Sequence, residues 1–281
     1  MKRGIIALFL AILLLSMLFV GCNRNNEEIK CVDIKLTREQ YAFGVNKGDT
    51  VLLENANSLL SELKSSGELD KIIQKYFNND TSTFKTQASG IIDASKNQLV
   101  VATHTPFSPF EYVIGNRYCG IDIEIAGLLA QKMDKELVIK EFKFEDIFTA
   151  VANGDADIVM AGLSIVDSRT DIIDYTDTYF EASQLIIARK YDNTFNECKT
   201  TEDVVEILSR MNKTTSIGYQ INTISEAYVK GDIKQGFNGY MVNAVGFPSA
   251  QDAVKALMNG EINYVILDEA PAKIIVAEFN K

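Results

Sequence analysis

Two stretches of the chain alternate short apolar strands with helical segments, and this alternation restricts the fold more than any other feature. In the first stretch, strands expected at 99–103, 137–142 and 158–161 are separated by helices expected at 122–132 and 145–152. The second stretch repeats the pattern, with strands at 216–219, near 245 and at 264–267, and helices that begin near 223, 250 and 271. Such alternation predicts mainly parallel sheets covered by helices. We therefore expect two α/β lobes.

An internal similarity links the two stretches. Residues 148–162 read FTAVANGDADIVMAG and residues 254–268 read VKALMNGEINYVILD, so that helix, Asn-Gly turn and apolar strand follow in the same order. The two strands end at Gly162 and Asp268. Ligands of open α/β sheets bind beyond the carboxyl ends of strands, so these two residues are expected to face one cleft. The alternative is that Asp268 merely caps the helix expected from Pro271.

The charge of the chain excludes one class of partner. Its 281 residues include 28 Lys and Arg against 38 Asp and Glu, a formal net charge of -10. A nucleic-acid-binding surface needs clustered basic residues to follow the phosphates. We therefore expect no nucleic acid as a partner.

The N-terminal residues predict the location of the protein. Two basic residues precede an apolar run at 5–20, which ends at Gly21 and Cys22. The run is shorter than the ~20 residues that cross a bilayer comfortably, and a small residue before Cys suits a peptidase. The pattern resembles a bacterial lipoprotein signal, in which the cysteine is acylated; the alternative is an uncleaved membrane anchor. We expect a signal peptide at 1–22, acylation of Cys22, a tether at 23–28, and lipid anchoring at the extracytoplasmic face of the cell membrane.

The remaining cysteines are Cys31, Cys119 and Cys198. Their odd number and the absence of a CxxC spacing give no disulfide framework and no zinc motif. One pair could form in an oxidising compartment, and three free thiols are an equally good interpretation. No function is assigned to them.

Several motifs in series carry a family resemblance. Within 99–183 stand VVATHTPFSPFEY, GIDIEIAGLLAQKM and MAGLSIVDSRTDIIDYTDTYF, and further along stand SIGYQINTISEAY and INYVILDEAPA. Together they resemble the polar-amino-acid-binding family of periplasmic substrate-binding proteins. The resemblance implies a two-lobe fold with a two-strand hinge and the role of the binding component of an ABC importer. Its partners would be a free L-amino acid and an ABC permease.

One segment stands out of the family's usual order. Residues 41–77 look like the segment that ends such proteins, yet here they come first, followed by a polar linker at 78–89. The resemblance implies a circular permutation. It divides the chain into lobe 1 at 41–188, which includes the linker, and lobe 2, formed by 29–40 together with 189–281.

The permutation also implies where the chain crosses between the lobes. The crossings are expected at 41–46 and 185–190, side by side as the hinge. The alternative is that residues 29–77 form a separate appendage or exchange into a second molecule, so that a swapped dimer is left open beside a monomer.

A zwitterionic ligand needs a cation for its carboxylate and an anion for its ammonium group. Arg169 suits the carboxylate, because a guanidinium donates two parallel bonds and stays charged. The resemblance implies the same role for Arg169, with help from the backbone of Thr223 at a helix start. It also implies Asp268 as the ammonium partner, with further bonds from the Gly162 backbone and the Ser164 hydroxyl. Without the resemblance, an arginine at position 169 would more often be a surface ion-pair residue.

The resemblance assigns the ligand's side chain to an aromatic pocket. Phe107 and Phe144 match the two positions that enclose the ligand, and Gln220 is a weaker pocket candidate. His104, the only histidine, stands where many relatives carry an acidic residue, so a strongly basic ligand is not expected. His104 either donates to a polar ligand group or bonds the backbone. Asn222 replaces a commonly seen Gly, which affects how Thr223 is presented.

The sequence is also compatible with two other functions. Some dehydratases resemble the same fold, and Glu111 and Glu269 are candidate acids for such an enzyme. With a single histidine, the sequence contains no catalytic triad, Cys-His pair or metal spacing, so no metal, no cofactor and no catalytic residue is expected. The other possibility is a ligand-sensing module that signals through a partner.

Overall fold

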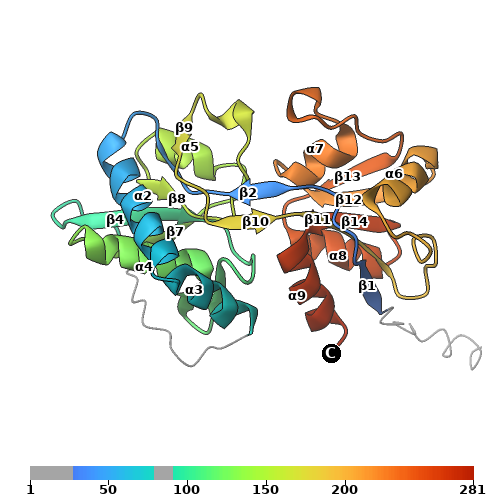
Figure 1. Cartoon of the computed structure of the whole chain (residues 1–281), viewed down its shortest axis with the longest axis horizontal. Helices are drawn as coiled ribbons and strands as arrows, with labels where there is room; N and C mark the ends of the chain where they lie inside the picture. The colour runs from blue at the N-terminus through green and yellow to red at the C-terminus, as the bar shows by residue number, and fades with distance from the viewer. Residues whose placement is uncertain (1–27, 79–90) are drawn as a thin grey trace, which may run out of the picture.

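The computed structural model describes residues 28–78 and 91–281, and in them the chain forms two α/β lobes joined by a two-stranded ribbon (Figure 1). The expected two-lobe α/β class is confirmed. The expected signal peptide, Cys22 and nearly all of the tether and the linker lie outside the described residues. Among the helices that the structure describes, none is both long and apolar enough to cross a bilayer.

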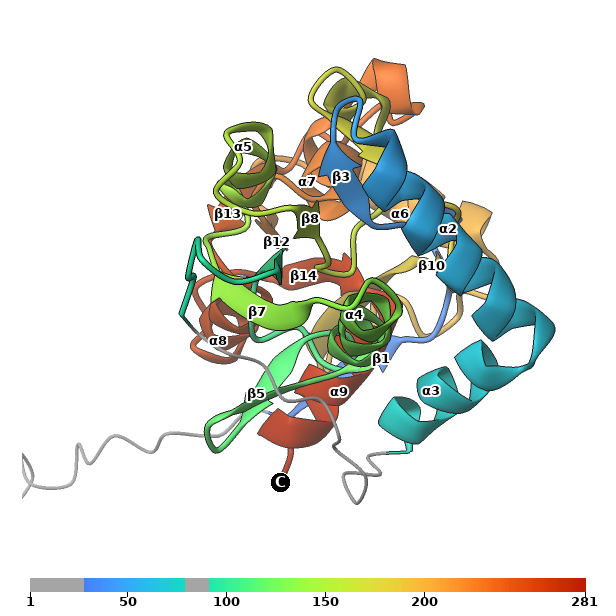
Figure 2. The ribbon, with the colours of Figure 1, turned by 90° about the vertical axis from the view of Figure 1, so that its left-hand side faces the viewer.

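Lobe 1 is built on a five-stranded sheet. Its strands lie in the order β7 (Glu136–Glu141), β4 (Gln98–Thr103), β8 (Ile158–Val159), β3 (Gly44–Asn46) and β9 (Ile173–Tyr175). Helices α2 (Thr50–Ser65), α3 (Glu68–Phe77) and α4 (Ile121–Lys132) share one core with this sheet, and α5 (Ile147–Ala152) packs in a second. Figure 2 shows α2 and α3 along the flank of the lobe, beside α4. A hairpin of β5 (Tyr112–Ile114) and β6 (Arg117–Cys119) completes it.

Helix α2 forms where the sequence predicts it. The Asp49 side chain accepts a hydrogen bond of 3.0 Å from the Leu52 N–H and so caps the helix start. Its buried residues recur at helical spacing: Leu52, Ala56, Leu59, Leu60 and Leu63. After Ser66, Gly67 takes a φ of 72°, a left-handed conformation that lets the chain turn directly into α3.

Lobe 2 is built on a second five-stranded sheet. Its strands lie in the order β1 (Ile29–Val32), β11 (Gln184–Arg189), β14 (Tyr264–Asp268), β12 (Ser216–Gln220) and β13 (Asn243–Phe247). Residues of α6 (Thr201–Arg210) and α7 (Ile224–Lys230) share one core with the sheet, and those of α8 (Ala250–Met258) and α9 (Glu269–Phe279) share another. The two short 3-10 helices are η1 (Asp167–Arg169) and η2 (Ile233–Gln235).

Each sheet is mixed, which corrects the expectation of mainly parallel sheets. In lobe 1, β4 pairs parallel with β7 and β8, whereas β3 pairs antiparallel with β8 and β9. In lobe 2, β12 pairs parallel with β13 and β14, whereas β11 pairs antiparallel with β1 and β14. The strands joined through helices are parallel, as the alternation predicts. The antiparallel strands are those that enter or leave a lobe next to the ribbon.

The ribbon consists of β2 (Glu39–Tyr41) and β10 (Phe180–Ala182), paired antiparallel with Tyr41 opposite Phe180. The crossings expected at 41–46 and 185–190 are therefore displaced toward the N-terminus. Strand β3 already belongs to the sheet of lobe 1, and β11 belongs to that of lobe 2. The lobe boundary expected at 188 moves with them, because long apolar strands such as β11 extend beyond the crossing into the sheet.

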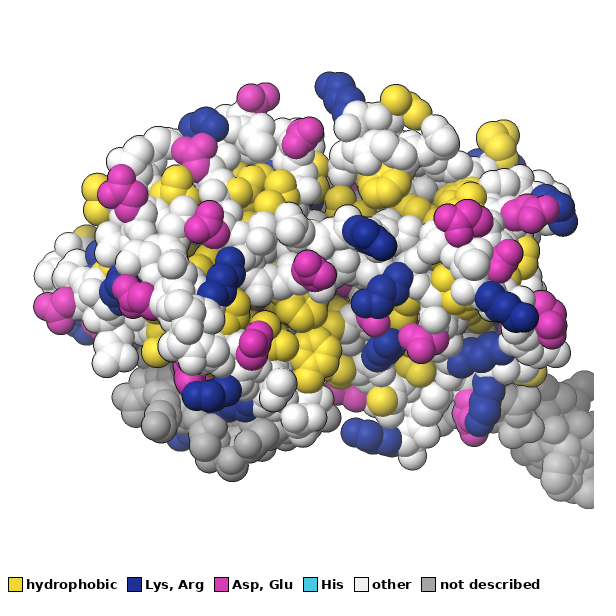
Figure 3. Space-filling model, viewed as in Figure 1, with side chains coloured by type: hydrophobic (Ala, Val, Ile, Leu, Met, Phe, Trp, Pro, Cys, Tyr) yellow, Lys and Arg dark blue, Asp and Glu magenta, His cyan; other side chains and the backbone are white. Residues whose placement is uncertain are grey.

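Residues 39–77 are an integral part of their own chain. Strand β3 lies between β8 and β9, and the leucines of α2 are buried in the main core of lobe 1. This arrangement contradicts a separate appendage. Within the part of the chain that the structure describes, Cys31, Cys119 and Cys198 form no disulfide. On the face that Figure 3 shows, acidic and basic side chains are interspersed.

Candidate functional site

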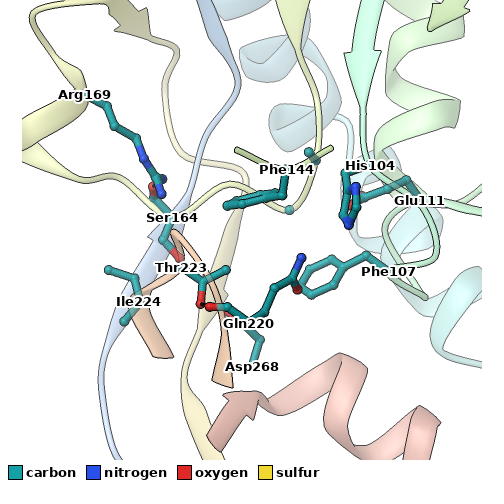
Figure 4. Close-up of a pocket in the computed structure, with 12 residues that line it drawn as sticks. His104, Phe107, Glu111, Phe144, Ser164, Arg169, Gln220, Thr223, Ile224 and Asp268 are labelled. Atoms are coloured by element: carbon teal, nitrogen blue, oxygen red, sulfur yellow. Dashed lines mark hydrogen bonds between the residues drawn. The ribbon is translucent and has the colours of Figure 1, made fainter. Parts of the chain in front are cut away.

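A small cavity of about 20 Å³ lies between the lobes. The residues of its wall that the sequence predicts are His104, Phe107, Phe144, Gly162, Ser164, Arg169, Gln220, Thr223 and Asp268. They comprise all nine predicted ligand-binding residues, and Figure 4 shows how those with side chains converge. The first six belong to lobe 1 and the last three to lobe 2. Clefts between two domains are common binding places for small ligands.

Arg169 spans the gap between the lobes. It ends η1, and its Nη1 donates 3.3 Å to the Ser164 carbonyl, whereas its Nη2 donates 2.5 Å to the Asn222 carbonyl of lobe 2. The guanidinium lies 4.4 Å from the ring centroid of Phe148. Burial lowers the pKa of Arg169, but a guanidinium remains charged at any physiological pH. Arg169 is thus a positive group held by neutral carbonyls and an aromatic face, which leaves its charge available to an anion.

Asn222 and Thr223 form the entry to α7. Asn222 has a φ of 62°, a conformation in which glycine is at ease and asparagine is tolerated. This explains how Asn replaces the Gly expected here. Thr223 is the N-cap residue of α7, but its hydroxyl donates 2.8 Å to the Gln220 carbonyl and makes no cap bond. The side chain of Thr223 therefore joins the helix start to the end of β12.

Asp268 is anchored to the ribbon. It is 7% exposed at the end of β14, and its Oδ1 accepts a hydrogen bond of 2.5 Å from the Tyr41 hydroxyl. Although α9 begins at the next residue, the Asp268 side chain makes no cap bond. The capping alternative is therefore wrong. Burial and the negative charge of Glu39 raise the pKa of Asp268 to about 7.

Gly162 and Ser164 occupy the loop after β8. Gly162 has a φ of 53°, and a Cβ there would lie 2.5 Å from Phe107 Cε1, so only glycine fits. Its N–H donates 2.8 Å to Asp122 Oδ2, so this N–H is not available to a ligand. The Ser164 hydroxyl donates 2.7 Å to Glu39 Oε2.

Aromatic rings and the histidine form the remaining wall. Phe107 is 9% exposed, and Phe110 lies behind it with 5.9 Å between the ring centroids. The Phe144 ring lies edge-on to His104 at 6.0 Å. His104 Nδ1 lies 2.9 Å from the Phe142 carbonyl, which can only accept, so Nδ1 carries the hydrogen. His104 therefore does bond the backbone, and Nε2 is its remaining polar atom.

The two candidate acids are placed differently. Glu111 lines the cavity, is 1% exposed, and its Oε2 has no partner among the described residues. Burial raises the pKa of Glu111 well above its usual range, and the neighbouring Asp122 raises it further. Glu269 instead pairs with Lys35 and Lys273, each 2.9 Å away. Only Glu111 is in a position to act on a bound molecule.

Three residues behind the cavity wall are not predicted as site residues by the sequence: Glu39, Tyr41 and Asp122. Each bonds a predicted ligand residue from behind, namely Ser164, Asp268 and Gly162 respectively. Their positions depend on the ribbon and on α4, so no local motif marks them. No group of residues suited to hold a metal ion occurs in the part of the chain that the structure describes.

Comparison with known proteins agrees with this geometry. The family model for bacterial extracellular solute-binding proteins, family 3, matches residues 99–276, well over half of the chain. The arginine-binding extracellular protein ArtP of Bacillus subtilis is 30% identical over 98 residues, 35% of this chain and 38% of the relative. A probable histidine-binding protein of Neisseria gonorrhoeae is 27% identical over 171 residues, covering 60% and 58%. The matches span less than two thirds of each relative's length.

Solved structures extend the comparison to the fold. An ancestral arginine-binding protein bound to arginine is 28% identical, with a TM-score of 0.56, and the match covers 66% of this chain and 76% of that one. An ancestral amino-acid-binding protein described as a precursor of cyclohexadienyl dehydratase is 21% identical with a TM-score of 0.55, covering 75% and 78%; at this identity it shows the fold alone. The chain belongs to family 3 of the bacterial extracellular solute-binding proteins.

Proposed function

We propose that this protein captures a free amino acid between its two lobes and delivers it to an ABC importer. The observation that carries the proposal is that Arg169 of lobe 1 and Asp268 of lobe 2 line the same cavity. One offers a cation and the other a carboxyl group, which matches the two charges of a zwitterion. A ligand held in this way bridges both lobes and favours the closed arrangement.

Each end of the zwitterion has its own partners. The ligand carboxylate takes both nitrogens of Arg169, in exchange for the Ser164 and Asn222 carbonyls that they now contact. The ammonium group donates to Asp268, to the Ser164 oxygen and to the Gly162 carbonyl. The ligand's side chain lies between Phe107 and Phe144.

His104 narrows the class of side chain. Because Nδ1–H is donated to the Phe142 carbonyl, Nε2 of the neutral ring can only accept a hydrogen bond. A ligand side chain that donates, such as an amide, suits this atom. A strongly basic side chain lacks the acidic partner that the family usually places at this position. The names of the relatives include arginine, histidine and glutamine, and we favour an amide ligand here.

The proposal is tested by ligand identification. Native mass spectrometry of the freshly purified protein should show a co-purified amino acid. A calorimetric screen of the twenty standard L-amino acids should then give one tight ligand, with polar uncharged side chains favoured. Failure of every amino acid to bind would overturn the proposed function.

We also propose that the protein is held at the membrane by lipid at Cys22. The support is the lipoprotein-like signal together with membership of an extracellular family. A diacylated cysteine anchors stably where one chain is marginal. Cys22→Ser should release the protein from membranes in fractionation and detergent partitioning. A variant that still partitions with membranes would indicate an uncleaved signal instead.

We infer the circular permutation from the order in which the chain segments contribute to the fold. The family match begins at residue 99, whereas the strands and helices of 39–77 that complete lobe 1 precede it. The Ile29 N–H donates 3.0 Å to Asn280 Oδ1, and the Asn280 amide donates 2.8 Å to the Ile29 carbonyl. These residues are thus already neighbours, and a short link could join them.

The permutation predicts that the usual order can be restored. A chain that begins at residue 91, continues to Lys281 and is followed by residues 28–78 should fold and bind the same amino acid. Affinity within a few-fold of the natural order supports the permutation. If the rearranged chain does not fold while the original chain does, the permutation is contradicted.

A second candidate function is a lyase that protonates its substrate. One observation favours it: Glu111 is a cavity-lining carboxyl, and burial raises its pKa well above its usual range, which favours the protonated form. Such a group can act as a general acid. Turnover of prephenate or arogenate, lost in Glu111→Gln, would establish this activity; absence of turnover leaves Glu111 as part of a binding site.

A further inference from the structure

Glu39 lies in the ribbon, yet it contacts side chains that belong to both lobes. Its Oε2 accepts 2.7 Å from the Ser164 hydroxyl of lobe 1. Its Oε1 accepts 2.6 Å from Thr37 and 3.0 Å from the Gln184 amide of lobe 2. Both carboxylate oxygens are thus engaged by donors, which holds the group in one orientation.

We propose that Glu39 is a positioning residue that makes the site selective for an ammonium group. It takes the only hydrogen of the Ser164 hydroxyl, so that Ser164 can offer only lone pairs to a ligand. This inference rests on the proposed function and deepens it. It states why the cavity should prefer an amino acid to the corresponding hydroxy acid or keto acid.

The bond to Glu39 fixes which hydrogen-bonding role the Ser164 hydroxyl can take toward a ligand. A serine hydroxyl has one hydrogen and two lone-pair sites. With the hydrogen committed to Glu39, a ligand group next to Ser164 must be a donor. An ammonium group has three hydrogens and can serve Ser164, Asp268 and the Gly162 carbonyl at once. A ligand hydroxyl has one hydrogen, and a ketone has none.

Charge adds to this preference. Glu39 is close enough to Asp268 for its negative charge to raise the pKa of that carboxyl. The same charge attracts a positive group placed between the two. Ser164 and Asp268 are buried, at 8% and 7% exposure, so this attraction is weakly screened.

The contacts of Glu39 extend to the lobe 2 wall. Gln184 is fully buried, donates to Glu39 through Nε2, and accepts 2.7 Å from the Ser225 hydroxyl through Oε1. Ser225 lies in the first turn of α7, two residues after Thr223. A single carboxylate in the hinge therefore supports an ammonium contact in lobe 1 and the helix that presents Thr223 in lobe 2.

The test compares Glu39→Gln with Glu181→Gln. Glu181 lies on the neighbouring ribbon strand, opposite Gln40, and is exposed. Both substitutions remove one negative charge from the ribbon, but only Glu39 touches Ser164. An amide at position 39 cannot accept through both ends, so it loses the Ser164 bond or the Thr37 and Gln184 bonds.

The measurement is a selectivity ratio. Calorimetry gives the affinity for the L-amino acid that the wild type binds most tightly in the screen of twenty, and for the 2-hydroxy acid with the same side chain. Glu39→Gln should lower the amino acid's affinity roughly tenfold to a hundredfold, the effect of a hydrogen bond to a charged group. The hydroxy acid's affinity should fall much less. Glu181→Gln should leave the ratio unchanged.

A double-mutant cycle separates positioning from a general structural role. If Glu39 acts through Ser164, Glu39→Gln should change the ratio much less in a Ser164→Ala background. Ser164→Ala alone should also lower the ratio, which keeps the test decisive if Glu39→Gln does not fold. An equal loss for both ligands, or full additivity, would overturn the inference. If amino acids bind the wild type and both Glu→Gln variants behave alike, only this inference fails; if none binds the wild type, the proposed function fails.

Discussion

The Tyr41 hydroxyl donates a hydrogen bond of 2.5 Å to Asp268, so the ribbon is bonded directly to a predicted ligand residue. Tyr41 is fully buried, and its ring lies among Phe110, Tyr179 and Phe180. Its position in β2 makes it part of the ribbon about which the lobes would move. An ammonium group bound at Asp268 would therefore contact a carboxyl group that the hinge already holds through Tyr41.

The raised pKa of Asp268 should make ligand binding depend on pH. Asp268 has a pKa raised to about 7 by burial and by Glu39, so at pH 6 the carboxyl is mostly protonated. A protonated Asp268 attracts an ammonium group only weakly, and affinity should rise as the pH increases through 7. Calorimetry in two buffers with different ionisation enthalpies should show proton release on binding near pH 7. An affinity that is constant from pH 5.5 to 8 would contradict this.

Tyr41→Phe should move that pH dependence. The Tyr41 bond favours the ionised form of Asp268, so its loss raises the pKa further above 7. The midpoint of the affinity profile should shift to higher pH, with affinity near pH 8.5 the least affected. Tyr228→Phe is a matched control, because it removes a buried hydroxyl that bonds Tyr240 in lobe 2, away from the cavity.

Asp122 should make the ligand-free protein less stable as the pH rises. Burial raises its pKa to about 7, so the folded state binds a proton that the unfolded state releases near pH 4. Its stabilising contribution is complete below pH 4 and is lost as the pH rises through 7. Asp122→Asn removes this titration.

The measurement for Asp122 is a difference between two denaturation series. Relative to the wild type, the free energy of unfolding of Asp122→Asn should increase between pH 4 and pH 7, on the order of 1.4 kcal/mol for each unit of pKa shift removed. The trend is diagnostic because the lost contacts to Gly162 and Tyr179 lower stability at every pH. A difference that does not vary with pH would exclude Asp122 as the titrating group.

Gly162→Ala tests how closely the cavity wall is packed. A Cβ at Gly162 would meet Phe107 Cε1 at 2.5 Å, and the backbone φ of 53° is strained for alanine. Gly154→Ala has a similar strain, with φ of 79°, but its Cβ would meet nothing within 4 Å. Both should lose ~1 kcal/mol of stability from backbone strain. Only Gly162→Ala should also weaken ligand binding by displacing Phe107, and equal affinities would contradict this packing.

The lobes could be predicted from sequence because their signals are local. The repeat at 148–162 and 254–268 combines a helix, a turn and a strand, and each forms close to where the pattern places it. The antiparallel half of each sheet could not be predicted in this way. Whether β3 and β11 run with or against their neighbours depends on the path of the chain through the ribbon, which leaves no periodic signal.

The residues of the cavity also divide into those that the sequence predicts and those that it does not. Arg169, Asp268 and Thr223 stand in motifs with a recognisable order, and the structure brings them together. Glu39 and Tyr41 differ, because EQY carries no motif and its role arises only when β2 pairs with β10. Residues that support others from behind are defined by tertiary contacts.

Arg169→Ala should abolish amino-acid binding while the protein stays folded. The substitution leaves the ligand's carboxylate without its charged partner in a desolvated cavity, which costs ~3 to 5 kcal/mol. Arg169→Lys keeps the charge but loses the two-pronged geometry, so it should restore only part of the affinity. The control is Arg210→Ala, which removes an exposed arginine that pairs with Glu206 on α6.

Arg169 also links the lobes through the Asn222 carbonyl, at 2.5 Å. Arg169→Ala should therefore shift the ligand-free protein toward more open arrangements, seen as an increased radius of gyration in solution scattering. Arg210→Ala should not. If Arg169→Ala binds the amino acid about as tightly as the wild type and its scattering profile is unchanged, then Arg169 is not part of the binding site. Loss of affinity with an unchanged profile would retain the carboxylate contact and exclude only the bridging role.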